Sequence, residues 1–284
     1  MFLSNRILNC TRYLLWVSYD GSRFPEMAKS VDSRGVMSFV NTAFRCSCKI
    51  DAFSRTDKGV HACRNALCIQ VPNEGIGCDK KVLLNSLNKI AVDCIPGGIR
   101  FLDIESVSNG FCVRRHALYR KYRYRILITN KEEVLKNTLS LTEFSEANYS
   151  WLLPAGFHPY KAKEACELFK VLFSSFWVFL AAIMLHFSNR YTIYVIAKSF
   201  LRGQVRRMVS TIVSYSYDRT NLETIASLFL DAKPEKYHWN GFRPAPAGGL
   251  YLDDVVYDSR MFMNPVPYVH HLWDAADDSG LSNI

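Results

Sequence analysis

The sequence lacks closely spaced cysteine pairs and internal repeats of fixed period. None of its nine cysteines forms a C-x-x-C pair, and their number is odd. This pattern argues against zinc ligation, and against a disulfide framework in a chain of 284 residues. It predicts reduced thiols, and therefore a location in the cytoplasm, the nucleus or the mitochondrial matrix.

Acidic residues are scarcer than basic ones. The chain has 35 lysines and arginines against 26 aspartates and glutamates, which gives a formal net charge of +9. This surplus is a mild argument for a polyanionic partner. With 49% hydrophobic and 21% charged residues, the composition is that of a globular chain, long enough for one large or two small domains.

Two segments raise questions of targeting. Residues 1–12 contain two arginines, two hydroxyl side chains and no acid, so they are compatible with a very short mitochondrial presequence or with an irregular terminus before the first strand.

Residues 171–189 have no formal charge, and their length nominates a transmembrane helix. Ser174, Ser175 and His186 interrupt this stretch, which favours a buried element over a membrane span.

The spacing of apolar residues predicts a chain that mixes helices and strands. Predicted strands cover residues 13–19, 66–71, 99–104, 121–126, 191–197 and 250–257, and predicted helices start after Gly35, at Lys80 and at Phe200. The strand at 66–71 has the alternation of a half-buried strand. The helix from Phe200 has an apolar stripe made by Leu201, Val205, Met208 and Ile212.

One short polar stretch, Ser54–Ala62, separates two apolar segments and carries Asp57 near its centre. We interpret it as a loop that delivers Asp57 and Arg55 to the end of a sheet, because connections often carry catalytic groups. A carboxylate beside guanidinium groups stays ionised, so it can act as a nucleophile or a base. The alternative is an ordinary Asp-Lys-Gly turn in which Gly59 supplies a positive φ.

Residues 114–125 are rich in arginine and tyrosine. In a strand, Tyr122 and Tyr124 fall on one face, whereas Lys121, Arg123 and Arg125 fall on the other. Aromatic rings beside cations suit stacked bases and phosphates. A strand with tyrosines in the core and arginines in solvent would give the same pattern, so both interpretations stay open here.

Four stretches, in this order, resemble motifs of the tRNA pseudouridine synthase A family (TruA-like). They are Ser54-Arg55-Thr56-Asp57-x-Gly59-Val60-His61-Ala62, Arg120-x-Tyr122-x-Tyr124, Phe200-Leu201-x-x-Gln204-Val205-Arg206-x-Met208 and Ala245-Pro246-Ala247-x-Gly249-Leu250-x-Leu252. The resemblance spans roughly residues 13–257. Its detail is closest to the animal tRNA pseudouridine synthase-like 1 branch.

The resemblance implies a role for each matching residue. Asp57 is then the catalytic aspartate that acts on a flipped uridine, Arg206 its basic partner and Tyr122 the ring that stacks on the uracil. Arg55 is the residue that occupies the place of the flipped base. The RNA-binding residues that we expect are Arg55, Arg120, Lys121, Tyr122 and Arg202. Because the isomerisation is redox-neutral, the resemblance implies neither a metal nor a cofactor.

The same resemblance implies an α+β fold, the pseudouridine synthase fold. Two αβ halves would join into one mostly antiparallel mixed sheet, with outer helices and a central basic cleft that binds tRNA. We divide the chain into a leader, an N-terminal catalytic half, a connector, a C-terminal half and a polar tail. Their bounds are 1–12, 13–129, 130–160, 161–260 and 261–284.

Three questions remain open at the level of sequence. The first alternative to an enzyme is a catalytically inactive RNA-binding homologue, because Val171 stands where the family has the histidine of a His-x-Phe-x-x-Phe stretch. The second is a protein anchored in a membrane by residues 171–189, although we expect no membrane partner. The family contains both homodimers and monomers, and the sequence does not choose between them.

Overall fold

The computed structural model describes residues 10–25, 27, 35–44, 49–52, 54–72, 79–108, 110–129, 145–173, 184–187, 189–231 and 234–262. The predictions for most of the leader, for residues 130–144 of the connector and for most of the polar tail lie outside these residues. The middle of the apolar stretch, residues 174–183, lies outside them as well.

Nine strands of the described chain form one sheet. They are β1 Cys10–Tyr19, β2 Lys49–Ala52, β3 His61–Pro72, β4 Ile99–Val107, β5 Ala117–Thr129, β6 Trp151–Pro154, β7 Met184–Phe187, β8 Arg190–Ala197 and β9 Leu250–Tyr257. The main order is β4-β1-β3-β9-β5-β8-β7, with β2 beside β3 and β6 beside β5. Among these described pairs, β3–β9 and β5–β6 are parallel and the others antiparallel, so the predicted mixed and mostly antiparallel sheet is confirmed.

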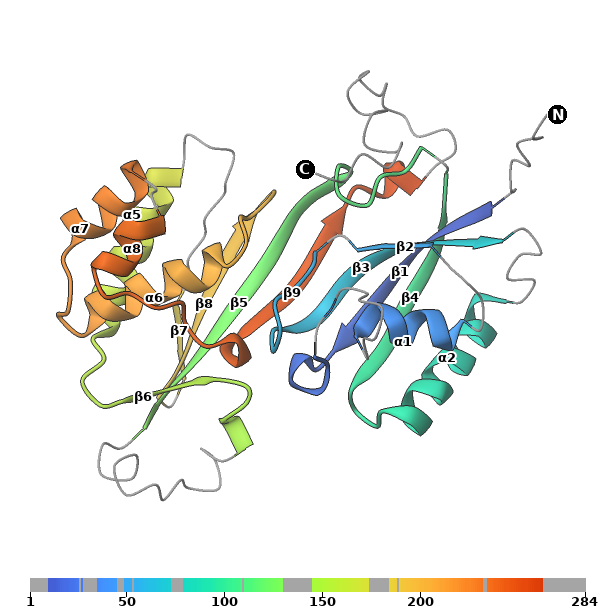
Figure 1. Cartoon of the computed structure of the whole chain (residues 1–284), viewed down its shortest axis with the longest axis horizontal. Coiled ribbons are helices and arrows are strands. Elements are labelled where there is room, and N and C mark those ends of the chain that lie inside the picture. The colour runs from blue at the N-terminus through green and yellow to red at the C-terminus, as the bar shows by residue number, and fades with distance from the viewer. Residues whose placement is uncertain are drawn as a thin grey trace.

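The last strand, β9, joins the two ends of the molecule. It pairs with β3 at His61 and Ala62, immediately after the Asp57 loop. On its other edge it pairs with β5, where Tyr122 lies opposite Leu252. The loop that carries Asp57 and the strand that carries Tyr122 are therefore separated by one strand at the centre of the sheet (Figure 1).

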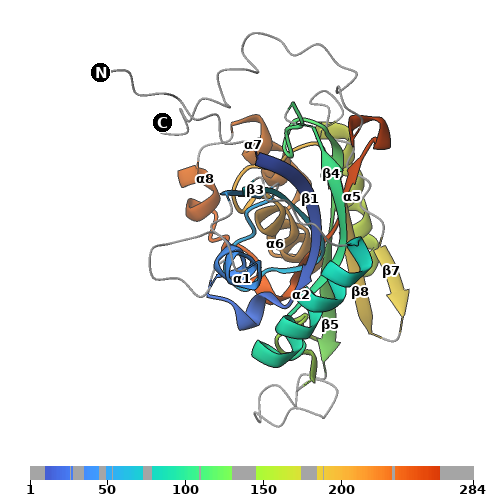
Figure 2. The same cartoon turned by 90° about the vertical axis from the view of Figure 1, so that its right-hand side faces the viewer.

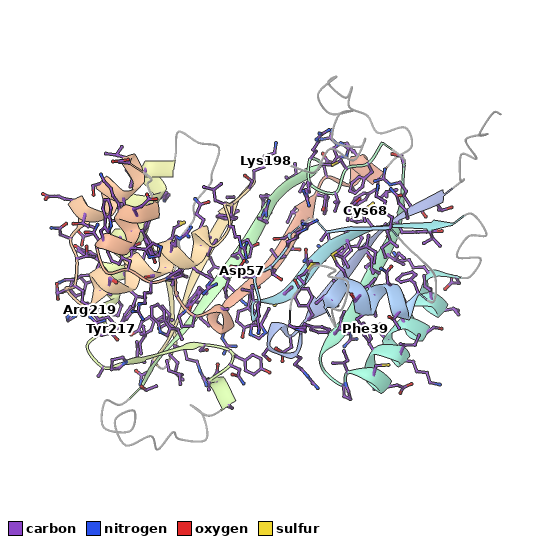
Figure 3. All side chains as sticks on the ribbon, in the orientation of Figure 1. Phe39, Asp57, Cys68, Lys198, Tyr217 and Arg219 are labelled. Atoms are coloured by element: carbon purple, nitrogen blue, oxygen red, sulfur yellow. The ribbon has the colours of Figure 1, made fainter. Side chains whose placement is uncertain are left out.

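Helices gather at the two ends of the sheet (Figure 1). Beside β1 to β4 lie α1 Val36–Ala43 and α2 Lys80–Cys94, and at the other end lie α5 Pro159–Phe173, α6 Gln204–Ser216, α7 Leu222–Leu230 and α8 Pro234–Trp239. With the sheet turned nearly edge-on, α1 and α6 lie on the same side of it (Figure 2). Asp57 lies between the two groups of helices (Figure 3).

Local chemistry explains where the helices begin. The Asp79 side chain accepts hydrogen bonds from the amides of Lys81 and Val82 at the start of α2, and Asn221 caps α7 in the same manner. Gly203 precedes α6 with a φ of 69°, a left-handed conformation that glycine adopts readily. The helix predicted from Phe200 therefore begins at Gln204. Leu201 lies outside it and is 78% exposed, so its place in the apolar stripe was wrong.

The alternation of apolar and polar residues predicted the buried and exposed faces correctly for β5 but not for β3. Tyr122, Tyr124 and Ile126 are buried on one face of β5, while the cations between them are partly exposed, as predicted. In β3 the predicted half-buried stretch is instead buried on both faces from Ala66 to Ile69. One reason is that Trp16, opposite Ala66, is itself covered by the ring of Phe262 at 5.9 Å.

The apolar stretch at 171–189 does not form one helix. Its described ends are the last residues of α5, which stops at Phe173, and the strand β7, which pairs with β8. Within the described residues, no helix is both long and apolar enough to cross a membrane. The connector also contains regular structure, since β6 lies inside residues 130–160 and pairs with β5.

Candidate active site

The Asp57 loop, Ser54–Val60, leads from β2 into β3 and contains the turn that its sequence predicts. The carbonyl of Asp57 accepts the amide of Val60 at 3.1 Å, and Gly59 has a φ of 79°. A side chain at Gly59 would adopt a strained φ and would lie 3.2 Å from Cβ of Ala247. The predicted Asp-Lys-Gly turn is therefore present in the structure. It fixes the backbone that carries the Asp57 side chain.

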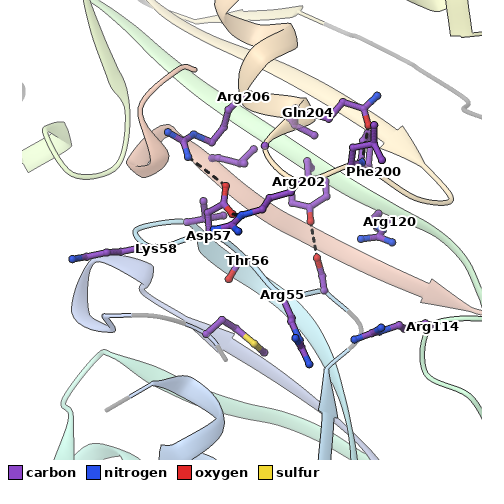
Figure 4. Close-up of a pocket in the computed structure, with 18 of the residues that line it drawn as sticks. Arg55, Thr56, Asp57, Lys58, Arg114, Arg120, Phe200, Arg202, Gln204 and Arg206 are labelled. Atoms are coloured by element: carbon purple, nitrogen blue, oxygen red, sulfur yellow. Dashed lines mark hydrogen bonds and ion pairs between the residues drawn. The ribbon is translucent and has the colours of Figure 1, made fainter. Parts of the chain in front are cut away.

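Two arginines approach the Asp57 carboxylate (Figure 4). Nη1 of Arg206 lies 3.3 Å from Oδ2, and Nε of Arg202 lies 3.7 Å from Oδ1. The Asp57 and Arg206 side chains are 25% and 22% exposed, whereas Arg202 is 95% exposed. Arg206 is thus the partly buried partner, and Arg202 reaches the carboxylate from solvent.

The backbone around Ala245 fixes Arg206. Nε of Arg206 donates to the carbonyl of Ala245 at 2.6 Å, and the Ala245 amide donates back to the carbonyl of Arg206 at 3.1 Å. Tyr124 in turn donates to the carbonyl of Pro246 at 2.8 Å. Burial raises the pKa of Tyr124 despite the nearby positive charge of Arg206, so this hydroxyl keeps its proton. A side chain at Gly249 would clash with the Tyr124 ring, which accounts for the glycine.

Tyr122 lies in the same pocket with its hydroxyl fixed. Its oxygen lies 2.7 Å from Oγ of Ser54, at the start of the Asp57 loop. Phe200 packs edge-on against the Tyr122 ring, with centroids 5.3 Å apart. Tyr122 is 7% exposed, so its ring belongs to the wall of the pocket and not to the outer surface.

These groups line a pocket of about 730 Å³, which we call the Asp57 pocket. Its walls come from the Asp57 loop, from β5 and from the segment that leads into α6. Asp57 is the acid among the lining residues, and the cations are Arg55, Lys58, Arg114, Arg120, Arg202 and Arg206. An excess of positive charge in a concave site concentrates anionic ligands.

The structure brings together most of the predicted site residues. Asp57, Arg206, Tyr122, Arg55, Arg120 and Arg202 all line the Asp57 pocket. Lys121 does not line it. Lys121 lies on the opposite face of β5, where its ammonium group is 3.2 Å from Asp253 and 4.7 Å from the centre of the Tyr194 ring.

Several pocket residues escaped the sequence analysis as functional residues. Ser54 and Phe200 lie within two of the motifs, but nothing in the sequence shows that each contacts Tyr122. Arg114 opens the basic run, and only the turn before β5 directs it toward the pocket (Figure 4). Its Nε donates to the carbonyl of Ala52 at 3.4 Å. Arg114 could have been found as the first residue of the basic run 114–125. The strand pattern, however, covered only the later cations of that run, from Lys121 onward.

The thiols and possible metal ligands of the described residues do not form a further site. In the described segments, no group of three or more His, Cys, Asp or Glu side chains could hold a metal ion. Cys63, Cys68, Cys94, Cys112 and Cys166 are free thiols. Burial raises the pKa of Cys166 to about 12, so this thiol stays protonated at neutral pH.

Comparison with known proteins adds an independent line of evidence. Residues 163–258 match the family model described as tRNA pseudouridine synthase. The tRNA pseudouridine synthase A of Dictyoglomus thermophilum is 29% identical over 260 residues, which cover 85% of this chain and 97% of that protein. The enzyme of the same name from Mycoplasma genitalium is 29% identical over 264 residues, covering 87% and 99%. That of Ureaplasma parvum serovar 3 is 25% identical over 256 residues, covering 86% and 99%.

The mixed, mostly antiparallel sheet is consistent with the pseudouridine synthase fold, and the relatives that match this chain are named tRNA pseudouridine synthase A. The match to the family model is limited to residues 163–258, and these three relatives are 25–29% identical to this chain. The similarity extends over nearly the full length of the relatives and so includes both the Asp57 loop and α6.

Proposed function

We propose that this protein converts uridine to pseudouridine in tRNA, with Asp57 as the nucleophile acting on an everted uridine. The observation that carries the proposal is the Asp57 carboxylate, paired with Arg206 inside a pocket that Tyr122 also lines. The tRNA substrate is taken from the names of the relatives and agrees with the cations around the pocket.

The electrostatics suit an anionic nucleophile. Partial burial disfavours a carboxylate, whereas a guanidinium group at 3.3 Å favours it. Arg206 is fixed by two hydrogen bonds to Ala245, so it need not reorganise when the substrate arrives. Arg202 is almost fully exposed and can exchange its contact with Asp57 for one with an RNA phosphate.

The pocket also suits a base that has left its stack. A uridine inside a helical stem cannot be reached by a protein side chain, so it must be extruded into a pocket and held against an aromatic ring. The volume of about 730 Å³ lies in the usual range of about 300 to 1,000 Å³ for small-molecule sites. Tyr122 provides the ring, and the surrounding arginines provide contacts to the phosphates on either side.

The reaction balances without any other reactant. The bond between N1 of uracil and C1′ of ribose breaks, the base rotates, and a bond between C5 and C1′ forms. C5 loses its proton and N1 gains one, so nothing is oxidised or reduced. The Asp57 carboxylate attacks either C1′ or the uracil ring, or it assists cleavage of the glycosidic bond, and it is released when the new bond has formed.

Release of tritium from tRNA labelled at C5 of uridine tests the proposal. We expect release by the wild-type protein and none by Asp57→Ala. Asp254→Ala is the matched control, because Asp254 also pairs with an arginine, Arg64, at 3.0 Å but does not line the pocket. Wild-type protein that binds tRNA without releasing tritium would instead establish the inactive RNA-binding homologue, for which the described site gives no support.

Three finer assignments belong to the same proposal. We place the chain nearest the animal tRNA pseudouridine synthase-like 1 branch on the detail of its four motifs. We propose a location in the mitochondrial matrix or in the cytoplasm or nucleus, on its cysteine pattern. We also propose that it can form a homodimer, as the resemblance of its four motifs to the family implies. Cell fractionation tests the location, and light scattering of the purified protein tests the dimer.

A further inference from the structure

A polar network lies directly beneath the Asp57 loop and contains two residues with no assigned role, Tyr19 of β1 and Asn65 of β3. We propose that Asn65 and Tyr19 are positioning residues, which hold the Ser54 carbonyl and the Thr56 side chain on either side of Arg55 and so fix Asp57 and Tyr122 for the reaction. The inference rests on the function proposed above for Asp57.

Asn65 is the centre of the network. Its side chain is fully buried, with 0% exposure, on β3, where the residues that follow it, Ala66 to Ile69, are buried and apolar. One amide hydrogen is donated to the carbonyl of Ser54 at 3.0 Å and the other to the Tyr19 hydroxyl at 3.2 Å. The Asn65 oxygen accepts the amide of Ala66 at 2.9 Å. Both donors and the acceptor of this side chain are therefore used.

Tyr19 extends the network to the residue before Asp57. Because its oxygen accepts from Asn65, its own hydrogen is available to Oγ1 of Thr56, which lies 2.8 Å away. Tyr19 is 4% exposed, and burial raises its pKa, so the hydroxyl stays protonated and able to donate. Thr56 is adjacent to Asp57 and also lines the pocket.

Ser54 connects the same network to the aromatic wall of the pocket. Its carbonyl is held by Asn65, and its hydroxyl lies 2.7 Å from the Tyr122 hydroxyl. The loop that presents Asp57 and the ring proposed to hold the base are therefore attached to one buried group. A shift of Asn65 would move both at once.

Stability gives only a partial reason for this arrangement. An apolar side chain at position 65 would avoid the cost of burying an amide, but it would remove the donor to the Ser54 carbonyl, and these two effects oppose each other. A fully satisfied polar network instead favours one geometry over its alternatives. At an active site, one geometry is what matters, because misplacement by about 1 Å can lower a rate by about 100-fold.

The test measures single-turnover tritium release and tRNA binding in Asn65→Leu and Tyr19→Phe. We expect Asn65→Leu to lower the rate constant about 100-fold, and Tyr19→Phe by a smaller factor, while the Kd for tRNA stays within about twofold. Asn88→Leu is the matched control. Asn88 also joins two backbone groups, those of Phe101, but it lies on α2, away from the pocket.

A double-variant cycle separates positioning from general destabilisation. Tyr19→Phe and Thr56→Val remove the same hydrogen bond, so their effects on the rate constant should not add, and the double variant should be no slower than the slower single variant. Tyr19→Phe removes only a hydroxyl group and should fold. Its rate constant therefore still tests the positioning role if Asn65→Leu does not fold.

Each outcome decides between the proposals. An unchanged rate constant in folded Asn65→Leu and Tyr19→Phe, with release still abolished by Asp57→Ala, would overturn the positioning role and leave the function intact. Equal losses in Asn65→Leu and Asn88→Leu would also overturn it, because a purely structural role would then suffice. Release that persists in Asp57→Ala would instead overturn the proposed function.

Discussion

The carboxylate of Asp57 and the guanidinium of Arg206 lie 3.3 Å apart although 149 residues separate them in the chain. The pairing depends on β9, which lies between β3 and β5 and is preceded by the Ala245 segment that holds Arg206. The position of this ion pair is therefore set by the closure of the whole sheet, and not by either motif alone.

Arg206→Lys should impair the enzyme even though it keeps the charge. The arginine donates to Asp57 and to the carbonyl of Ala245 through different nitrogens, and a single ammonium group cannot reproduce that geometry. A hydrogen bond to a charged group is worth about 1.5–3 kcal/mol, so we expect a loss of about 10- to 100-fold in kcat. Steady-state tritium release measures it. Arg207→Lys, on the exposed side of the same helix, should behave as wild type, and an equal loss there would contradict the prediction.

Tyr122→Ala should remove the surface on which the base stacks. Stacking of a base on an aromatic side chain is worth about 1–3 kcal/mol, so we expect kcat/KM to fall about 10- to 100-fold. Tyr122→Phe should retain more activity, since it keeps the ring and loses only the contact with Ser54. Tyr194→Ala removes a ring from the opposite face of the sheet and serves as the control. A Tyr122→Ala enzyme as active as Tyr194→Ala would exclude the stacking role.

The two neighbouring cations Arg120 and Lys121 should differ in their effect on tRNA binding. Arg120 lines the Asp57 pocket, whereas Lys121 pairs with Asp253 on the other face of β5. Arg120→Gln should raise the Kd for tRNA and lower the slope of log K against log salt by about 1, because one phosphate contact is lost. Lys121→Gln should leave the slope unchanged. The measurement is a filter-binding titration at several salt concentrations, and equal slopes for the two variants would contradict the assignment of faces.

The ionised side chain of Asp20 should make the free energy of unfolding depend on pH in the acid range. Burial acts to raise the pKa of its carboxyl group, but hydrogen bonds from Ser22 and Tyr149 and the proximity of His61 outweigh burial, so the pKa lies below its ordinary value of 3.8. A lowered pKa in the folded state means that this stabilisation is present above pH 3.8 and is lost as the pH falls through the folded value. The stability advantage of wild type over Asp20→Asn should therefore shrink below pH 3.8.

Urea midpoints measured from neutral pH down to the acid range check this linkage. Tyr149→Phe removes one of the two hydrogen-bonding partners, at 2.7 Å, and should show a weaker form of the same behaviour. A constant difference between wild type and Asp20→Asn across the whole range would show that Asp20 does not contribute in its ionised form.

The sequence predicted the fold where local pattern decides structure. Alternation located β5 with the correct faces, and turn residues located the Asp57 loop. It was wrong where distant segments decide burial. Ala66 to Ile69 alternates like a half-buried strand, but Trp16 and Phe262 cover the second face, and nothing near residue 66 carries that information. Leu201 matches the helical spacing, but Gly203 starts α6 after it.

The candidate site was predictable to a similar degree. Motifs nominated Asp57, Arg206 and Tyr122, and all three line one pocket. The residues that hold them in place could not be found in this way, because Asn65 and Tyr19 act through three-dimensional contacts with the Asp57 loop. Lys121 lies outside the pocket, on the face of β5 opposite Tyr122, so its expected contact with RNA stays a prediction.

The most direct test of the account is single-turnover conversion of uridine to pseudouridine in tRNA by Asp57→Asn. Asparagine has nearly the shape of aspartate and can still contact Arg206, but it carries no negative charge to act as a nucleophile. The account predicts tRNA binding close to that of wild type with no conversion above background. Conversion by Asp57→Asn at a rate near that of wild type would contradict it.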